Sequence, residues 1–269
     1  MQQVVDENVI LKINSISVCF DGFYALTEVD VSVKRNTVHF FIGPNGAGKT
    51  TLLDIICAKT RPTLGNVVFY PAGVPQGGHH GHHGIRLTGM HEYQIARNGV
   101  GRKFQVPSVF VNLTVLDNMM LSLKRHKSIF DSIFCRPSDE EFTQIDEILE
   151  KVGLTKRKDV KAGSLAHGEK QWLEIAMQIA AKPQLIMLDE PVAGMGRAET
   201  DKTAEILGEI KRECTVIVVE HDMEFVKMAA DIVTVLHEGK VLTEGCISDV
   251  LADKTVQAVY LGRGGERNA

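Results

Sequence analysis

At 269 residues the chain is long enough to bury a sizeable core, either as one large α/β domain or as two lobes. Its formal net charge of −4 shows no overall basic excess, so we expect no nucleic-acid partner, although a local basic patch is not excluded. Five widely spaced cysteines without a C-x-x-C pair predict buried, reduced thiols, and the lack of a basic and apolar leader or of 18 consecutive apolar residues predicts a chain that is neither exported nor membrane-spanning.

Alternating apolar residues predict an antiparallel layer at the start of the chain. Period-2 alternation over 9–19 and 29–33 is typical of strands, and a short run of β-favouring residues follows at 38–42. Residues 60–90 are rich in Gly, Pro and His, and only 66–70 is a convincing strand there. The rest of that segment is expected to be loop.

The middle third is expected to be mostly helical. A helix is predicted over 91–98 with Gly99 as its stop, and another begins at Thr114. A capping box opens a third helix at Ser138, which Gly153 ends.

After residue 163 the pattern changes to helices and strands in alternation. Helices are predicted over 169–180, 198–211 and 223–230, and strands over 184–188, 215–219 and 232–236. This rhythm is typical of a parallel sheet with crossover helices. We therefore predict an α/β core interrupted by a helical insertion.

A glycine-rich segment between a predicted strand and a predicted helix fits G-x-x-x-x-G-K-[ST]. Its residues are Gly43, Pro44, Asn45, Gly46, Ala47, Gly48, Lys49 and Thr50, followed by Thr51. Glycines allow backbone N–H groups to surround phosphates, and the lysine adds a positive charge. The Thr50 hydroxyl is a suitable Mg²⁺ ligand, and the helix N-terminus favours anions. The segment predicts a nucleotide phosphate site.

A second chemical pattern is an apolar strand that ends in two carboxylates, Asp189 and Glu190. In a parallel sheet, ligands lie beyond the carboxyl ends of the strands, which places these residues beside the phosphate loop. Consecutive strand residues point to opposite sides, so they are expected to do different work. We predict that Asp189 binds magnesium and that Glu190 is the general base.

The order of these motifs resembles the ATP-binding cassette (ABC) ATPases over about residues 9–251. Phe20 matches the aromatic residue that stacks on adenine in that family, with Phe23 and Tyr24 as alternatives. Gln105 matches the glutamine that contacts Mg²⁺ or the attacking water, and His221 matches the histidine that bonds the γ-phosphate. The resemblance thus implies catalytic roles for Gln105, Glu190 and His221.

The family's Leu-Ser-Gly-Gly-Gln signature is altered here. The matching residues are Leu165, Ala166, His167, Gly168 and Glu169. In the family this segment meets the γ-phosphate of ATP held by a partner subunit, and Ala166 cannot make the serine's hydrogen bond. Gly196 stands where many relatives have an aspartate. The resemblance therefore implies an ATPase that requires ATP and Mg²⁺ and whose hydrolysis is weakened at one of two composite sites. The alternative is an ATP-dependent switch with low turnover.

Within the family the chain is most similar to the ATP-binding subunits D of bacterial urea transporters, and next to branched-chain amino-acid importers. The segments 20–23, 101–105, 168–174, 190–195 and 219–225 carry this resemblance. It implies hydrolysis of ATP to power uptake of urea or a related small polar solute. It also implies a second cassette subunit, integral membrane permease subunits, indirectly a solute-binding protein, and a peripheral place on the cytoplasmic face of the plasma membrane.

The resemblance implies a P-loop NTPase (RecA-like) core with an antiparallel β layer and an inserted helical subdomain. One ATPase domain would span 8–253, with the core in 8–105 and 166–253 and the helical subdomain in 106–165. The tail at 254–269 is expected to be a docked turn with a frayed end.

The segment 71–90 is a Gly- and His-rich loop. It contains His79, His80, His82 and His83, whose imidazoles suit a transition metal. A flexible, solvated insertion is the alternative, because fixed ligand geometry usually needs a scaffold.

Overall fold

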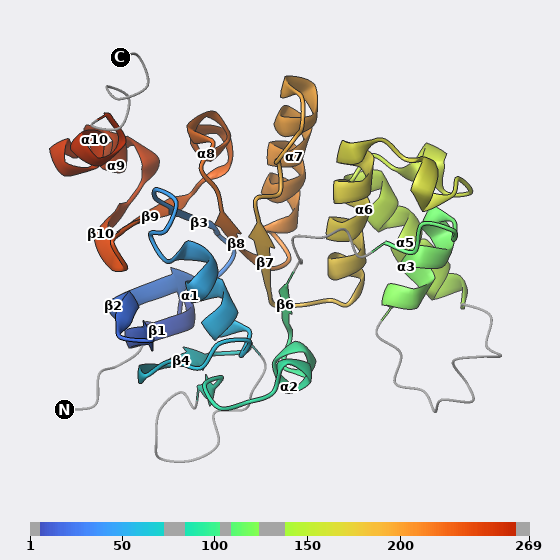
Figure 1. Ribbon diagram of the computed structural model, residues 1–269. Helices are drawn as coiled ribbons and strands as arrows, with labels where there is room; N and C mark the ends of the chain where they lie inside the picture. The colour runs from blue at the N-terminus through green and yellow to red at the C-terminus, as the bar shows by residue number, and fades with distance from the viewer. Residues whose placement is uncertain (1–5, 73–83, 103–108, 124–137, 262–269) are drawn as a thin grey trace.

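A six-stranded, mostly parallel sheet organises the molecule (Figure 1). The computed structural model describes residues 6–72, 84–102, 109–123 and 138–261. The strands follow the order β10-β9-β3-β8-β7-β6, and only β10 runs antiparallel to its neighbour. Their bounds are β3 Val38–Ile42, β6 Val100–Arg102, β7 Leu185–Asp189, β8 Thr215–Val219, β9 Ile232–His237 and β10 Lys240–Gly245.

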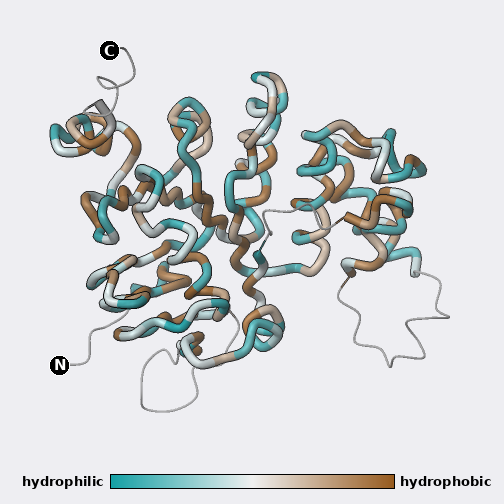
Figure 2. The backbone as a smooth tube through the Cα atoms, in the orientation of Figure 1, coloured by the Kyte–Doolittle hydropathy of each residue, from teal (hydrophilic) through white to brown (hydrophobic). Residues whose placement is uncertain are grey.

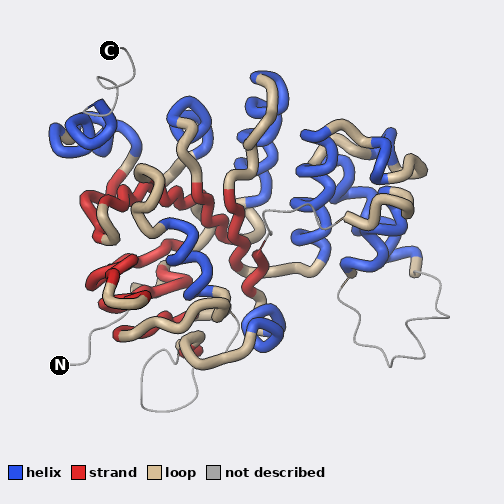
Figure 3. Tube along the Cα trace, in the orientation of Figure 1, coloured by secondary structure: helices blue, strands red, loops and turns tan. Residues whose placement is uncertain are grey.

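One face of this sheet is covered by helix α1 (Lys49–Ile56) and by a four-stranded antiparallel sheet in the order β2-β1-β4-β5. That layer is seen at the lower left of Figure 3, where its strands are red. The strands are β1 Val9–Phe20, β2 Phe23–Lys34, β4 Leu64–Phe69 and β5 Ile85–Arg86. The predicted antiparallel layer is confirmed, whereas the two-residue strand β5 was expected to be loop.

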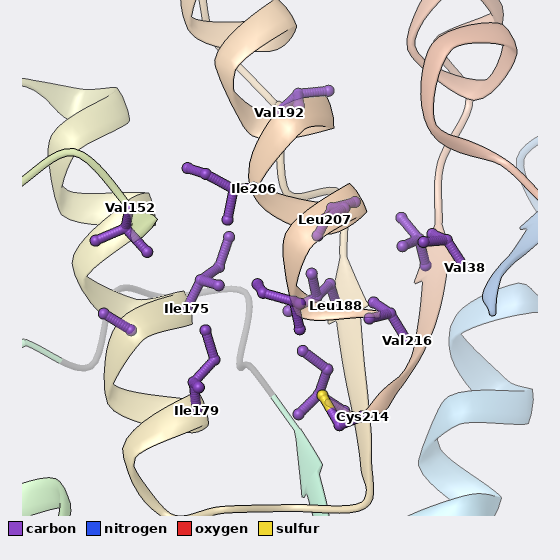
Figure 4. Close-up of a cluster of buried hydrophobic side chains, with 14 of the residues drawn as sticks. Val38, Val152, Ile175, Ile179, Leu188, Val192, Ile206, Leu207, Cys214 and Val216 are labelled. Carbon is purple, nitrogen blue, oxygen red and sulfur yellow. The ribbon is translucent and has the colours of Figure 1, made fainter. Parts of the chain in front are cut away.

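The opposite face is covered by α6 (His167–Ala180), α7 (Arg197–Ile210) and α8 (Met223–Ala229). Alternation along the strands divides the core. In β3, Phe40 belongs to the cluster under these helices, while Phe41 belongs to the cluster around α1. Figure 4 shows Ile175 and Ile179 of α6 meeting Ile206 of α7 in the first cluster.

The central strands are apolar on both faces, as strands covered by helices or a second layer require. All five residues of β3, β7 and β8 are buried. Figure 2 shows these strands as a continuous brown band through the middle of the molecule. The predicted parallel sheet with crossover helices is confirmed, with the strand 215–219 correct to the residue.

Helices α3 (Val115–Ser122) and α5 (Asp139–Lys151) pack on α6 away from the sheet (Figure 1). Both begin at a capping box, which the sequence predicted at Ser138, whereas at Thr114 it predicted only the start of the helix. Thr114 Oγ1 accepts a hydrogen bond from Asp117 N at 3.0 Å, and Ser138 Oγ accepts one from Glu141 N at 3.3 Å. Two short 3₁₀ turns, η1 Thr155–Arg157 and η2 Ala162–Ser164, lead into α6.

Helix α2 (Glu92–Arg97) precedes the edge strand β6, and Gly99 takes the left-handed conformation that ends it, with φ 94°. Helix α9 (Ile247–Ala252) precedes the tail, which differs from the expectation of a turn because its first residues form helix α10 (Lys254–Leu261). Burial of Val256 against the main core explains why the second of them forms.

The cysteines are partly as predicted. Cys57 and Cys214 are buried, but Cys19 is half-buried and Cys246 is exposed, so the expectation of buried thiols is wrong for these two. Cys246 caps a short surface helix, a position that composition alone does not reveal. In the described part of the chain, no helix combines the length and apolarity needed to cross a membrane.

Candidate functional site

The phosphate loop links β3 to α1 and is shaped by glycines in left-handed conformations. Gly48, with φ 96°, precedes the helix, and a Cβ there would lie 2.5 Å from Leu26 Cδ2. At Gly43 a Cβ would lie 2.1 Å from the carbonyl oxygen of Leu236. Only glycine fits at these two positions, because the antiparallel layer and β9 press against the loop.

The cation of the loop, Lys49, is buried, and its Nζ donates to the carbonyl oxygens of Gly43 at 2.8 Å and Pro44 at 3.0 Å. Burial lowers the pKa of this ammonium, and the nearby carboxylates Glu190 and Asp189 act in the opposite direction. The amine therefore lies inside the turn of the loop, where a phosphate would compete with the two carbonyls for its protons. Thr50 is exposed beside it in the first turn of α1.

Asp189 ends β7 with its side chain buried, and neither carboxylate oxygen has a hydrogen-bond partner among the described residues. Burial raises the pKa of this carboxyl, while Arg102 and Lys49 act to lower it. Buried carboxylate oxygens without donors suit a hard divalent cation, and Mg²⁺ is commonly held by one or two carboxylates in nucleotide sites. The residues present, Asp189 together with the Thr50 hydroxyl, therefore fit the magnesium expected from the sequence.

Glu190 lies just past the strand and has a left-handed backbone with φ 47°. This conformation is costly for a residue other than glycine and is held by the hydrogen bond from Glu190 N to Val219 O at 2.9 Å. The two carboxylates diverge because the strand ends at Asp189 and the chain then turns, not because of strand alternation. Glu190 remains partly exposed, as a base that must meet a water requires.

His221 faces Glu190 across the carboxyl ends of β7 and β8, with Nδ1 3.4 Å from Glu190 Oε1. Its ring is 61% exposed, so it is open to a ligand on the solvent side. The structure thus brings together Lys49, Asp189, Glu190 and His221, as the sequence predicts. Gln105 and the histidines at 79–83 lie outside the described residues.

Glu220 is a functional candidate that sequence reasoning missed. It is 1% exposed, and its Oε2 accepts from His221 N at 3.0 Å while its Oε1 accepts from Val192 N at 3.4 Å. Burial raises the pKa of this carboxyl, and the backbone donors counteract that shift. Glu220 therefore ties the loop that follows Glu190 to the loop that carries His221. Its signal in the sequence was its place directly after the apolar strand β8.

Arg102, the last residue of β6, was also missed. Its Nη1 lies 2.5 Å from Asp54 Oδ1 on α1, and its Nη2 lies 3.9 Å from Asp189 Oδ2. The three-residue strand that carries it is too short to show a period in the sequence.

A cavity of about 400 Å³ adjoins the phosphate loop. Its lining joins the start of β2 to the loop and to the β9–β10 turn, and consists of Phe23, Tyr24, Ala25, Pro44, Asn45, Gly46, Ala47, His237, Glu238 and Gly239. Phe20 is 48% exposed near the same hairpin but does not line this cavity. The two alternatives to Phe20 as aromatic platform therefore line the cavity beside the phosphate loop, and Phe20 pairs with Phe23 in the adjoining hairpin.

The signature residues lie at the start of α6, which packs on the opposite face of the six-stranded sheet from α1. Leu165 is buried, and Ala166 is the N-cap without a side-chain acceptor. His167 Nε2 lies 3.0 Å from Ala193 O, which links this segment to the loop after Glu190. The segment is thus not part of the same chain's phosphate site.

Two carboxylates lie at the N-terminus of α6. Glu169 Oε2 accepts from Ala166 N at 3.0 Å, and its Oε1 pairs with Arg157 Nε at 2.8 Å. Glu199 of α7 crowds Gly168, where a Cβ would lie 2.3 Å from Glu199 Oε1. Arg157 therefore neutralises Glu169, and Glu199 is the carboxylate that lies against Gly168.

Comparison with known proteins agrees with this geometry. A family model described as ABC transporter matches residues 26–193. The chain is 32% identical over 262 residues to the high-affinity branched-chain amino acid transport ATP-binding protein BraF of Pseudomonas aeruginosa, covering 94% of this chain and 98% of that protein. It is 30% identical over 264 residues to LivG, the corresponding protein of Escherichia coli (strain K12), with the same coverage.

Solved structures give the same answer. An ATP-binding cassette of an ABC transporter in its ADP conformation superposes with a TM-score of 0.79 at 28% identity, covering 94% of this chain and 99% of that one. A nucleotide-free cassette from an ABC transporter gives a TM-score of 0.77 at 28% identity, with 94% and 98% coverage. The α/β P-loop fold predicted from the sequence is confirmed. The chain belongs to the ABC transporter family and is an ATP-binding, ATP-hydrolysing subunit of the cassette type.

Proposed function

We propose that this chain powers an ABC importer, with its own phosphate loop in one of two composite ATP sites. The observation that supports this best is the convergence of Asp189, Glu190 and His221 at the carboxyl ends of β7 and β8, beside Lys49. All four groups lie at the carboxyl-end edge of the parallel sheet, which is where ligands bind in parallel α/β sheets.

Bound MgATP would supply the γ-phosphoryl group that water attacks and a metal charge that offsets developing negative charge. The protein's part is to bind and orient. The backbone N–H groups of the phosphate loop and Lys49 hold the phosphates, and Thr50 and Asp189 hold the metal. On this proposal Gln105 adds a further ligand or water contact.

Glu190 accepts the proton of the attacking water at its carboxylate, and His221 keeps that carboxylate and the water in place. The left-handed backbone of Glu190 directs it out of the strand toward this position. The buried Glu220 fixes the loop that follows Glu190 relative to the loop that carries His221, because it accepts hydrogen bonds from both.

For the base, we propose that Tyr24 or Phe23 provides the aromatic platform. Both line the cavity next to Pro44 and Asn45 of the phosphate loop, whereas Phe20, the first choice from the sequence, does not. Phe23 is 71% exposed and Tyr24 55%, so either ring has a free face on which adenine could stack.

The second half of each composite site would come from a partner cassette, because the helix that begins with this chain's signature and the helix that follows its phosphate loop lie on opposite faces of the sheet. We propose that the signature formed by 165–169 serves the partner's ATP poorly. Ala166 offers no hydroxyl, and Glu199 places a carboxylate against Gly168 of the signature. This favours a heterodimer in which the chain's own phosphate loop is the better-served site.

A switch with low turnover is a second candidate, and the same altered signature favours it. The two differ in rate: the importer subunit hydrolyses ATP steadily in the assembled complex, and the switch binds ATP without steady hydrolysis. Retention of Lys49, Asp189, Glu190 and His221 in one site favours the importer.

For the cargo we propose urea or a related small polar solute, from the resemblance of 168–174 and 190–195 to urea transporter subunits. Branched-chain amino acids are the alternative, because BraF and LivG carry that description. Cargo would be selected by permease and solute-binding subunits. On this proposal the cassette sits at the cytoplasmic face of the membrane, its core in 8–105 and 166–253 and its permease-coupling helical subdomain in 106–165.

The test is purification of the cassette with its native membrane partners and measurement of ATPase activity with each solute. Urea, leucine and an unrelated sugar are compared in the same proteoliposomes, with the solute-binding protein present. Stimulation by urea alone supports the cargo proposal, and stimulation by leucine alone assigns the alternative. Steady ATP binding without hydrolysis under every condition would establish the switch.

A further inference from the structure

Arg102 forms a buried ion cluster with two carboxylates beneath the candidate metal site. Its side chain is 9% exposed, Asp54 is 28% exposed and Asp189 is 1% exposed. The guanidinium also contacts the thiol of Cys57, whose pKa burial raises to about 11, so that sulfur carries no charge at neutral pH. The charged members are therefore one cation and two anions.

The topology explains why these three side chains meet. Arg102 pairs with Met187 across the parallel strands β6 and β7, and Asp189 lies two residues further along β7. Residues two apart on a strand share a face, so Asp189 and Arg102 both point toward α1. On α1, Asp54 follows Thr50 by one helical turn and lies on the same side.

The two pairs have different lengths. Nη1 is 2.5 Å from Asp54 Oδ1, a direct hydrogen bond, but Nη2 is 3.9 Å from Asp189 Oδ2, too far for one. Both oxygens of Asp189 are without a hydrogen-bond partner among the described residues. The hydrogen bond to Asp54 thus holds the guanidinium at a distance from Asp189 at which its positive charge stabilises the Asp189 carboxylate but does not occupy the lone pairs of the carboxylate oxygens.

A buried carboxylate needs an opposite charge when no metal is present. The other nearby cation, Lys49, has its ammonium on the carbonyl oxygens of Gly43 and Pro44, inside the phosphate loop. Arg102 is the cation within salt-bridge distance of Asp189 in the described part of the chain.

We propose that Arg102 is the resident counter-ion of Asp189, which holds the metal-binding carboxylate in place between turnovers and yields to Mg²⁺ when the metal arrives. Asp54 is the anchor that prevents Arg102 from closing onto Asp189 and blocking the metal. The inference rests on the proposed metal-binding role of Asp189. It assigns Arg102 a positioning role and no contact with the substrate.

The test is thermal unfolding of the purified full chain with saturating ADP, in EDTA or in MgCl₂ at matched ionic strength. In EDTA, Arg102→Met is expected to lower Tm by about 5 °C, because it leaves two carboxylates without their cation. Adding Asp189→Asn to that variant should restore at least half of the loss. The rise in Tm caused by Mg²⁺ should be larger for Arg102→Met than for the parent protein, because the metal replaces the missing charge.

Asp54→Asn tests the anchoring role of Asp54. Freed from its anchor, Arg102 would close onto Asp189 and compete with the metal, so the rise in Tm caused by Mg²⁺ should shrink. If Arg102 only braces β6 against α1 through Asp54, Asp54→Asn would rescue Arg102→Met, Asp189→Asn would not, and Mg²⁺ would raise Tm equally in all variants. That pattern would overturn the proposal.

Folding failure of Arg102→Met does not end the test. In that case a folded Arg102→Met/Asp189→Asn chain supports the proposal, and an unfolded one beside a folded Arg102→Lys chain contradicts it. Because the readout is unfolding in ADP and not hydrolysis, a failure here leaves the ATPase and transport assays of the proposed function unaffected.

Discussion

His39 should make the stability of this protein depend on pH in the mildly acidic range. The ring is fully buried in β3, the strand between β8 and β9, and burial lowers its pKa to about 3. Its Nε2 lies 2.7 Å from Thr234 Oγ1, which itself donates to Glu244 Oε2 at 2.7 Å. Nε2 is therefore the donor, and Nδ1, where a second proton would bind, has no partner among the described residues.

The magnitude follows from linkage. Between pH 6.5 and about 3 the unfolded chain binds a proton at His39 and the folded chain does not, so the free energy of unfolding falls as pH falls. Going from pH 7 to pH 5 costs about 2 kcal/mol from this residue alone. Asp189 and Glu220 titrate with raised pKa values and act in the opposite direction, so only a difference between variants isolates His39.

The assay is urea unfolding of the parent chain and of His39→Gln at pH 7 and pH 5. The amide keeps the hydrogen bond to Thr234 but does not titrate. The variant should be the less stable protein at pH 7, yet it should lose about 2 kcal/mol less than the parent on going to pH 5. His91→Asn, a histidine substitution at an exposed helix cap, is measured alongside for comparison. Equal losses in parent and His39→Gln would refute the reasoning.

Three further substitutions test the site. Gly48→Ala should reduce ADP affinity at least about tenfold and lower the free energy of unfolding in urea by about 1–3 kcal/mol, because its Cβ would clash with Leu26. Gly46→Ala is the matched control: Gly46 has φ 82°, but a Cβ there meets open space, so both losses should be smaller. Glu220→Gln places an amide against backbone donors and should lower kcat of the assembled complex about tenfold with little change in KM for ATP; an unchanged kcat would remove Glu220 from the account. Ala166→Ser completes the capping box with Glu169, so Tm should rise by about 2–4 °C, and ATPase activity should increase if the signature limits turnover; a lower Tm would show that the cap is misassigned.

The sequence predicts best those features that local chemistry determines. The phosphate loop, the helix start at Thr114, the capping box at Ser138 and the buried strand ending at Asp189 all have their signal within a few residues. The structure contains each of them where expected. Predictions of this kind need no knowledge of which distant segments meet.

Features made by long-range contacts were missed. Arg102 sits 48 residues from Asp54 and on a three-residue strand, so neither its partner nor its burial is visible in the local pattern. Glu220 has its function from the backbone donors of two separate loops. The order of preference among Phe20, Phe23 and Tyr24 also depended on the packing of the hairpin against the phosphate loop.

The proposed ATPase mechanism depends most directly on Glu190 as the general base of an ATP site on this chain. Glu190→Gln keeps the size and the backbone of the residue but cannot accept the water's proton, so ATPase activity of the assembled complex should fall at least about 100-fold. ATP binding to the same variant, measured by calorimetry, should be retained. Unchanged ATPase activity in Glu190→Gln would contradict the account.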